Sequence, residues 1–443
     1  MYIPSAVRDI LNTLTQAGHS AYMVGGCVRD FLIDRRSHDW DMTTSARPDE
    51  MLRIFAGKKV IPTGIRHGTV TVLADDIPVE VTTYRVDGGY EDHRHPSQVS
   101  FTRSLTDDLA RRDFTMNAMA YHPEEGLIDP FGGQADLRAR LIRCVGDPDT
   151  RFREDALRII RALRFSSMLG CSIEFRTQTA LRRGAPLLKT ISPERLYREW
   201  QSLLCGDGVE PVFLDYADVL AVLLPEIAAM RTCPQQHPCH MYDVYTHTVK
   251  SLSAAPADLL TRLSLLFHDA GKPSCRTRGT DGWDHFYGHA AQSASIANQW
   301  LQAMRADRAT VDTVTRLVSL HDADLPATRP AIRRWLGRLG ADNCRRWLDI
   351  RRADIEALAP EVRPGKMVAL KELSSLFDEV CREQECFSRR HLAINGRDLM
   401  AAGIPPGKDM GQLLTQMLEA VMDERLPNER EALLAWAAKA AKL

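Results

Sequence analysis

The sequence predicts an α+β fold, in which a head with a small mixed sheet is followed by all-α modules. A first helix is expected over residues 5–18, and strand-like runs follow at 21–24, 69–73 and 79–85, separated by Gly and Pro. Beyond about residue 147 such runs nearly vanish, and apolar residues recur with helical spacing. The 443 residues are more than one core normally supports, so we expect about two to four domains.

Charge and cysteine content narrow the class of protein. Lys and Arg number 57 and Asp and Glu 58, so any surface for nucleic acid has to be a local patch. The ten cysteines include no Cys-x-x-Cys pair, which is typical of reduced thiols and predicts neither disulfides nor a zinc ribbon. The N-terminus lacks a signal-peptide pattern and no run of about 18 apolar residues occurs, so we expect a soluble, cytoplasmic protein with no membrane partner.

The first motif that carries chemistry is a glycine pair followed by two carboxylates. Gly25 and Gly26 precede a predicted helix, whose N-terminus offers free N–H groups to the phosphates of a nucleotide. Asp39 and Asp41 are two residues apart, so on a strand their side chains share a face and could hold two divalent cations. Such cations activate a hydroxyl and neutralise leaving pyrophosphate, so the pattern predicts a nucleotidyl-transfer site. The alternative is a tight turn before a solvated acidic strand edge.

A third carboxylate is expected on a later strand. Glu80 shares a strand face with Thr82 and Tyr84, where it could bind a metal or act as base toward a primer hydroxyl. The alternative is an edge-strand residue that faces water. A polar loop over residues 87–96 should lie near the mouth of the site, as a lever in catalysis or as a long hairpin connection.

A pair of arginines and a glycine-containing turn follow. Arg111 and Arg112 offer guanidiniums for phosphates, and the polar side chains after them could test for a ribose 2′-hydroxyl. The alternative for such a pair is a solvated position on a helix. The stretch Asp129–Leu137 contains Pro and two adjacent Gly, and is expected to form a turn that joins the head to the neck.

A predicted helix over residues 153–165 has an unusual polar face. Glu154 lies four residues before Arg158 and can orient its guanidinium, and Asp155 projects nearby. An Asp acceptor beside an Arg donor can match the Watson–Crick edge of a base, whereas the alternative is an ordinary surface ion pair. Residues 151–200 contain eleven Lys and Arg against five Asp and Glu, a local positive excess that could bind an RNA backbone.

These motifs stand in an order that resembles the class II tRNA nucleotidyltransferases of the polymerase-β superfamily. The resemblance covers roughly residues 5–230 and rests on the motifs GGCVRD, DWD, RRDFTMNA, DPFGG, EDALR and ERLYRE. It implies a polymerase-β-like head that uses magnesium, a helical neck, and tRNA, CTP and ATP as partners. The implied activity is template-independent addition or repair of the CCA 3′ end of tRNA.

The resemblance also implies roles for individual residues. Asp39 and Asp41 would bind magnesium, with Glu80 as the third carboxylate of the catalytic set. The nucleotide-binding residues would be Gly25, Gly26, Arg29, Arg112, Asp113, Asn117, Glu154, Asp155, Arg158 and Arg161. Within this set, Asp155 and Arg158 would pair with the base of CTP or ATP, and Glu154 would orient Arg158. The RNA-binding residues would be Arg164, Arg195 and Arg198.

Residues 60–70 bear on the choice between the CCA-adding branch and the poly(A) polymerases. This chain has PTGIRHGTV there, similar to CCA-adding enzymes, whereas poly(A) polymerases of the class typically show an apolar pair, Gly, two basic residues and Phe. The alternatives within the class are an enzyme that adds only A and a poly(A) polymerase. The C-terminal stretches 392–399 and 428–430 resemble the body and tail of many bacterial members, where the tail would hold the tRNA elbow.

A second set of chemistry-bearing residues lies between about 237 and 360. Histidines and aspartates follow in the order His247, His268, Asp269, His289, His321, Asp322 and Asp354. Imidazole and carboxylate groups suit divalent transition metals. The pattern resembles the HD superfamily of metal-dependent phosphohydrolases, which implies His247, His268, Asp269 and Asp354 as the primary ligands. His289 and His321 would then serve a second metal or a phosphate, and Lys272 would bind a substrate phosphate.

The HD resemblance implies attack of metal-activated water on a phosphoester, such as a terminal or 2′,3′-cyclic phosphate on damaged RNA ends. A rival interpretation is a helical RNA-binding spacer with weakened activity. From other classes of function, the chain would be a phosphohydrolase whose head only binds RNA, or a pure RNA-binding module.

Four domains are expected from these motifs and from the loops between them. They are the nucleotidyltransferase head at 1–140, the helical neck with the base-reading helix at 141–230, the HD module at 231–362, and a helical body and tail for tRNA binding at 363–443.

Overall fold

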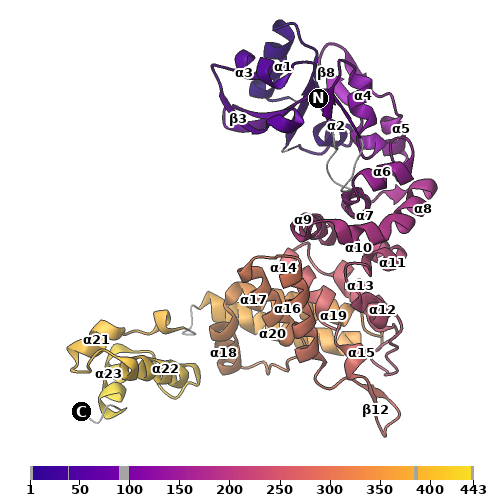
Figure 1. Ribbon diagram of the computed structural model, residues 1–443. Helices are drawn as coiled ribbons and strands as arrows, with labels where there is room; N and C mark the ends of the chain where they lie inside the picture. Colours follow the sequence, from indigo (N-terminus) through magenta and orange to yellow (C-terminus); the bar gives the residue numbers. More distant parts are fainter. Residues whose placement is uncertain (1–2, 38, 89–98, 384–387, 441–443) are drawn as a thin grey trace. The chain divides into compact units, whose positions relative to one another are not determined.

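The computed structural model describes residues 3–37, 39–88, 99–383 and 388–440 (Figure 1). The chain divides into two compact units, residues 1–225 and 226–443. The polar loop predicted at 87–96 falls, from residue 89 onward, outside the described residues. The finer division into four domains remains a prediction.

The head is built on a seven-stranded mixed sheet with the strand order β3-β4-β5-β2-β1-β8-β9. Strands β2 and β5 are parallel, and the other neighbouring strands in this sheet are antiparallel. The expected α+β class is thereby confirmed. The elements up to β9 are α1 Ser5–Gln16, β1 Ala21–Val24, α2 Gly26–Leu32, β2 Trp40–Thr44, α3 Pro48–Ile54, β3 Lys59–Gly64, η1 Ile65–His67, β4 Thr69–Ala74, β5 Ile77–Thr83, β6 Arg85–Asp87, β7 Val99–Phe101, α4 Leu105–Ala110, η2 Thr115–Asn117, β8 Ala120–His122 and β9 Gly126–Ile128.

The rest of the first unit is almost entirely helical, as the sequence predicts. Its elements are α5 Gly133–Arg138, β10 Leu141–Ile142, α6 Pro148–Glu154, α7 Leu157–Leu169, β11 Ser172–Ile173, α8 Phe175–Gly184, η3 Ala185–Thr190, α9 Pro193–Leu204, α10 Val209–Asp215 and α11 Ala217–Leu220. Helix α7 packs against α9 and α10, and its buried residues include Ile159, Ile160 and Leu163.

The prediction of a single helix over residues 153–165 is wrong in one respect, because the helix is interrupted at Asp155. This residue adopts an extended conformation (φ −137°, ψ 103°) between α6 and α7. Its carboxylate accepts a hydrogen bond from the backbone N–H of Leu157 at 3.1 Å, so it satisfies a free donor at the start of α7. Asp155 therefore caps the start of α7, whereas the apolar spacing alone predicts one helix that continues through this residue.

The second unit is helical, with one short hairpin among its described residues. Its elements are α12 Glu226–Arg231, α13 Val244–Ala254, α14 Leu259–Phe267, α15 Lys272–Cys275, β12 Thr277–Arg278, β13 Asp284–His285, α16 His289–Ala303, α17 Arg308–Ser319, α18 Arg329–Leu339, α19 Ala341–Glu356, α20 Arg363–Arg382, η4 Arg389–His391, α21 Gly396–Ala401, α22 Lys408–Met422 and α23 Arg430–Ala440. Helices α13, α14, α16, α17 and α19 pack on one another. Helix α20, which begins at Arg363, packs on α18 and α19.

Four helices start with the same local device. Asp147, Asp243, Asp258 and Asp307 each precede a helix, and each carboxylate accepts hydrogen bonds from the backbone N–H and the hydroxyl of the threonine three residues later. These N–H groups have no partner within the helix, so the caps stabilise each start by about 1 kcal/mol. Two of the capped helices, α13 and α14, carry or precede the histidines described below.

The described residues include no helix that is both long and apolar enough to cross a membrane. The cysteines among them are all free thiols, as the composition predicts.

The turn at Asp129–Leu137 gives a test of the fold. The backbone N–H groups of Gly133 and Gln134 donate to the Asp129 carboxylate at 2.7 and 2.8 Å, and a Cβ at Gly133 would lie 2.2 Å from the carbonyl oxygen of Thr115. We therefore expect Gly133→Ala to lower the free energy of unfolding by about 1–3 kcal/mol, because the backbone has to shift. Gly57→Ala is the matched control, since a Cβ there meets nothing within 4 Å. Equal melting temperatures for the two variants would contradict this packing.

Candidate functional site

The three predicted carboxylates of the head come from neighbouring strands. Asp41 on β2 is paired in register with Glu80 on the parallel strand β5, and Asp39 directly precedes β2. Burial raises the pKa of Asp41 to about 6; Arg112 opposes this shift, whereas Glu80 and Asp39 add to it. The carboxylates therefore lie close enough to influence one another, which is the arrangement that a divalent cation stabilises.

Gly25 lies directly against this acidic group. It has a positive φ of +73°, and a Cβ at this position would lie 3.5 Å from Oδ2 of Asp41 and 3.2 Å from Nη1 of Arg112. A side chain here would therefore crowd both the carboxylate and the guanidinium. Gly26 begins α2, so the N-terminus of this helix follows directly after Gly25.

The two arginines of the RRD motif have different surroundings. Arg111 donates to the fully buried carboxylate of Asp108 at 2.7 and 3.0 Å, and Thr43 donates to the same side chain at 3.0 Å. Arg112 is 3.5 Å from Asp108 but also borders Gly25 and Asp41. Of the two predicted phosphate contacts, Arg112 is thus beside the acidic group. Asp108 is a residue that the sequence reasoning missed.

A chain of polar contacts joins α2 to the neck. Arg29 donates to the amide oxygen of Asn117 at 2.8 Å, and the amide nitrogen of Asn117 donates to Asp113 at 3.1 Å. Arg161 on α7 donates to the other carboxylate oxygen of Asp113 at 2.6 and 2.9 Å. Although burial alone would raise it, Arg161 and Asn117 hold the pKa of Asp113 well below its usual range. Four predicted nucleotide-binding residues are thus brought together by direct hydrogen bonds.

Two residues outside the prediction complete this chain. The guanidiniums of Arg29, Arg161 and Arg164 lie 5.0, 5.3 and 4.2 Å from the centre of the Phe165 ring. Glu199 on α9, which is 7 % exposed, lies 3.1 Å from Arg164 and 3.7 Å from Arg161. An aromatic face and a carboxylate offset the repulsion among three cations. Glu199 could not be assigned from spacing, because Arg161 and Arg164 lie on another helix, whereas Phe165 stands four residues after Arg161 on α7.

The predicted base-reading residues lie at the break between α6 and α7. Glu154 accepts a hydrogen bond from Arg158 at 2.7 Å, as expected, and Arg158 also donates to the carbonyls of Arg151 and Arg111. Asp155 is 3.2 Å from Arg195, so that arginine contacts the base-reading pair. Arg198, by contrast, is exposed on α9.

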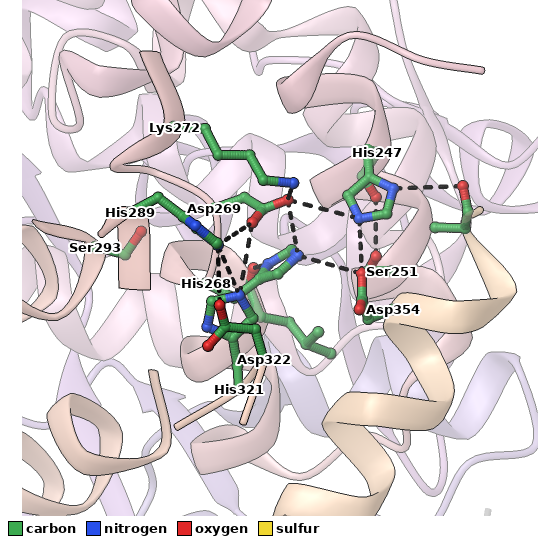
Figure 2. A network of polar contacts seen from close by, with 12 residues as sticks. His247, Ser251, His268, Asp269, Lys272, His289, Ser293, His321, Asp322 and Asp354 are labelled. Atoms are coloured by element: carbon green, nitrogen blue, oxygen red, sulfur yellow. Dashed lines mark hydrogen bonds and ion pairs between the residues drawn. The ribbon is translucent and has the colours of Figure 1, made fainter. Parts of the chain in front are cut away.

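The predicted metal ligands of the second unit converge on one centre (Figure 2). They form two groups, and within each group the ligand atoms all lie within 4.8 Å of one another. One group is His247, His268 and Asp354, and the other is Asp269, His289 and His321. Helix α13 carries His247, α19 carries Asp354, and α16 begins at His289. Across the two groups, Nε2 of His247 lies 3.7 Å from Asp269, which is therefore shared between them.

The four imidazoles are held in one orientation. Nδ1 of His247, His268, His289 and His321 faces the main-chain carbonyls of Ala357, Leu265, Phe286 and Val318, at 3.4, 2.7, 2.9 and 2.8 Å respectively. A carbonyl only accepts, so Nδ1 carries the hydrogen and Nε2 of each neutral ring presents its lone pair to the centre. Nε2 of His289 and Nε2 of His321 are 3.2 Å apart. Two facing lone pairs are unfavourable without a cation, so the donor set fits a divalent metal.

Charge at this centre supports the same fit. Burial would lower the pKa of His268, but Asp269 and then Asp354 raise it to about 10. The centre thus binds a proton tightly where a divalent cation would replace it.

Gly271 allows α16 to approach, because a Cβ there would lie 2.7 Å from the backbone of His289 and of Ser293.

Lys272, for which the HD resemblance implies a phosphate contact, is paired with one of the predicted ligands. Its ammonium is buried, lies 2.7 Å from Asp269 and donates to Gln235 at 2.8 Å. The ion pair compensates the buried carboxylate, so the lysine supports a ligand. His240, which is outside the predicted ligand set, has its ring centroid 5.2 Å from that of His247.

Comparison with known proteins agrees with both units. Residues 21–143 match the Poly A polymerase head domain, residues 170–231 match the probable RNA and SrmB-binding site of polymerase A, and residues 277–437 match tRNA nucleotidyltransferase domain 2 (putative). The CCA-adding enzyme of Lactobacillus helveticus is 33 % identical over 425 residues, covering 96 % of this chain and 94 % of the relative. That of Levilactobacillus brevis is 35 % identical over 429 residues, covering 97 % and 96 %.

Solved structures extend the likeness to the whole chain. The crystal structure of the Bacillus stearothermophilus CCA-adding enzyme in complex with CTP is 30 % identical, has a TM-score of 0.72 and covers 99 % of this chain and 98 % of that one. The Thermotoga maritima CCA-adding enzyme complexed with tRNA shares the fold at 19 % identity and a TM-score of 0.59, with coverages of 99 % and 96 %. These findings confirm the resemblance seen in the motifs, and this chain belongs to the family of CCA-adding tRNA nucleotidyltransferases.

Proposed function

We propose that this chain completes or repairs the CCA 3′ end of tRNA with CTP and ATP in the cytoplasm, and that Asp39, Asp41 and Glu80 form its catalytic set. The pairing of Asp41 with Glu80 beside Gly25 is the observation that carries this proposal. The primer 3′-hydroxyl oxygen forms a bond to the α-phosphorus, the bond from that phosphorus to the bridging oxygen breaks, and pyrophosphate leaves. Magnesium, when bound, neutralises charge on the phosphates.

The carboxylates suit magnesium because that ion is usually held by one or two carboxylates together with substrate phosphates. Asp39 and Asp41 would supply these ligands, and Glu80 would bind metal or accept the primer proton. The N-terminus of α2 at Gly26 and the guanidinium of Arg112 would hold the triphosphate. Arg29 is 9 % exposed and bonded to Asn117, so it acts by orienting that amide.

Asp155 and Arg158 would read the base of the incoming nucleotide. Arg158 is held by Glu154 and two carbonyls, and Asp155 is held at the start of α7, so both are fixed before a base arrives. We assign Asn117 to the ribose and Asp113 to positioning Asn117 and Arg161. Arg164 and Arg195 act mainly by positioning, since they contact Glu199 and Asp155. Arg198 is left to contact the tRNA, and residues 363–443 to hold its elbow.

A second function is favoured by the ligand set of Figure 2. We infer that residues 231–362 form an HD module that binds one or two divalent transition metal ions and hydrolyses a phosphoester, such as a 2′,3′-cyclic phosphate at an RNA end. The four imidazoles fixed by main-chain carbonyls support this inference. When bound, the metal supplies an activated water as nucleophile.

The pKa of Asp41 leads to a stability prediction. Its pKa is raised from 3.8 to about 6, so the folded chain binds this proton more tightly than the unfolded chain. The contribution of Asp41 to stability therefore falls as the pH rises from about 3.8 to about 6, and stays low above that range. In EDTA, Asp41→Asn should melt at a higher temperature than wild type at pH 7, and the difference should shrink toward pH 4. Magnesium should stabilise wild type only.

The control is Asp39→Asn, which removes an exposed carboxylate and should change the melting temperature in EDTA little. A lower melting temperature for Asp41→Asn than for wild type in EDTA at pH 7 would refute the unfavourable burial of Asp41.

Base reading can be tested with a tRNA that lacks CCA, given CTP, ATP or both, with products resolved on a sequencing gel. Wild type should add two residues with CTP and three with both nucleotides. Arg158→Ala and Asp155→Ala should lose the preference for C at the first position, because bidentate contacts to a base edge supply about 1–3 kcal/mol of discrimination. Asp41→Ala should slow all additions by about a hundredfold or more.

Arg198→Ala serves as the control, since it should raise the KM for tRNA and leave the order of C and A unchanged. If both base-reading variants still add C and A in the correct order, the assignment of Asp155 and Arg158 to base reading is wrong.

The HD module can be tested on the full-length protein with adenosine 2′,3′-cyclic phosphate as substrate. Hydrolysis should require added Mn²⁺, Co²⁺ or Ni²⁺, and should fall by more than about a hundredfold in His268→Ala, because a ligand is lost. CCA addition by this variant should stay near the wild-type rate. Hydrolysis that survives in His268→Ala, or that EDTA does not stop, would rule out this centre as its source.

A further inference from the structure

A cleft of about 370 Å³ opens beside the metal-binding groups of the second unit. His289 and Asp322 line it near those groups, and His240, Phe286 and Tyr287 are among its other lining residues. Its volume lies in the range of small-molecule sites, about 300–1,000 Å³. A reaction at the metal centre would therefore take place next to space for the rest of a small substrate.

Tyr287 presents a bare aromatic face at this cleft. Its side chain is 78 % exposed, although one face of the ring stacks on His285 with a centroid distance of 5.3 Å and an interplanar angle of 3°. Because that face is covered, the exposure comes from the opposite face and the edge. A large ring left in water beside a cleft is a ready surface for stacking a planar group.

The ring is also held in place. The carboxylate of Asp281 lies 2.9 and 3.1 Å from Nε2 of His285, and the Tyr287 hydroxyl lies 3.4 Å from Nδ1 of the same ring. A carboxylate only accepts, so Nε2 carries the hydrogen and Nδ1 accepts from the hydroxyl. The aromatic face is therefore fixed on the β12–β13 hairpin segment, and little side-chain freedom is lost when a ligand stacks on it.

A second row of rings leads from the solvent to the metal centre. Trp283, which is 42 % exposed, contacts His237 with a centroid distance of 6.1 Å. His237 contacts His240 at 6.3 Å, and His240 contacts the ligand His247 at 5.2 Å. Planar groups thus flank the approach to the metal centre from this side as well.

The charges near the cleft do not favour a long RNA backbone. Arg276 and Arg278 are each 3.1 Å from the carboxylate of Asp284, and Lys272 is paired with Asp269. Binding of many phosphates needs several cations that lack a protein partner. A cleft that offers aromatic rings for stacking but few cations without a protein partner suits a ligand of one or two nucleotides.

We propose that this cleft is a nucleoside subsite, in which the base of a 3′-terminal ribonucleotide stacks on Tyr287 while its phosphate lies at the metal-binding groups. The proposal rests on the phosphohydrolase function proposed above and adds the surface that would bind the base of its substrate. Stacking accepts every base, because each has a π-face, so the site would take RNA ends of any sequence.

The test compares wild type, Tyr287→Ala and Tyr287→Phe as full-length proteins with Mn²⁺. The substrates are adenosine 2′,3′-cyclic phosphate and 1-O-methylribose 2′,3′-cyclic phosphate, which lacks the base. Loss of stacking should raise the KM of Tyr287→Ala for the adenosine compound by about 5- to 150-fold with little change in kcat. The KM for the compound without a base should not change, and Tyr287→Phe should restore the wild-type value because it keeps the ring.

Binding of adenosine 2′-monophosphate, measured by calorimetry, gives a second readout that does not need turnover. Nucleotide bound by the head contributes equally to wild type and Tyr287→Ala, so the difference between them reports the cleft. Equal melting temperatures of all three proteins would show that they fold alike.

The outcomes separate the two proposals. Hydrolysis by wild type with no effect of Tyr287→Ala on KM or binding overturns the subsite and keeps the phosphohydrolase. Binding that is weakened in Tyr287→Ala, without hydrolysis by wild type, supports the subsite and overturns the hydrolytic function. The absence of both hydrolysis and Tyr287-dependent binding overturns both.

Discussion

The proposed nucleotide site depends on the buried carboxylate of Asp113, because this one group connects the head to the neck. One of its oxygens accepts from Asn117 and the other from Arg161, so it positions together the amide that we assign to the ribose and the helix that we assign to base reading. Removal of the carboxylate would leave the Arg161 guanidinium without its closest partner beside the Phe165 ring, which is costly in a buried place. A displacement of Asp113 would therefore disturb the proposed contacts to both the ribose and the base of the incoming nucleotide.

Much of this arrangement was predictable from the sequence because its spacing is short-range. Residues two apart on a strand share a face, so Asp39 and Asp41 were assigned together, and Glu154 four residues before Arg158 implied the hydrogen bond that forms. The ligand histidines were named from their order alone, by resemblance to a known superfamily. Their convergence depends on five helices whose packing the sequence does not give, so the shared position of Asp269 had to come from the structure.

The residues that were missed act across long separations or against local propensity. Glu199 faces Arg161 and Arg164 from another helix, and the hydroxyl of Thr43 on β2 donates to Asp108 on α4. Asp155 was assigned to a helix because the apolar period runs through it. Its side chain instead caps the backbone of the next helix, a competition that short polar residues win at helix ends.

The two proposed metal centres differ in how completely the protein prepares them. In the second unit, main-chain carbonyls fix four imidazoles, and the ligand atoms of each group already lie within 4.8 Å of one another. Among the described residues, the head gathers no comparable set of three ligand atoms, and its acidic cluster includes a carboxylate whose pKa is raised by burial. In our proposal, the phosphates of the nucleotide complete that site. A centre whose ligands are already in position binds its ion before the substrate arrives. The head, by contrast, would bind the ion and the nucleotide together. Metal binding in the head would therefore depend on the presence of CTP or ATP.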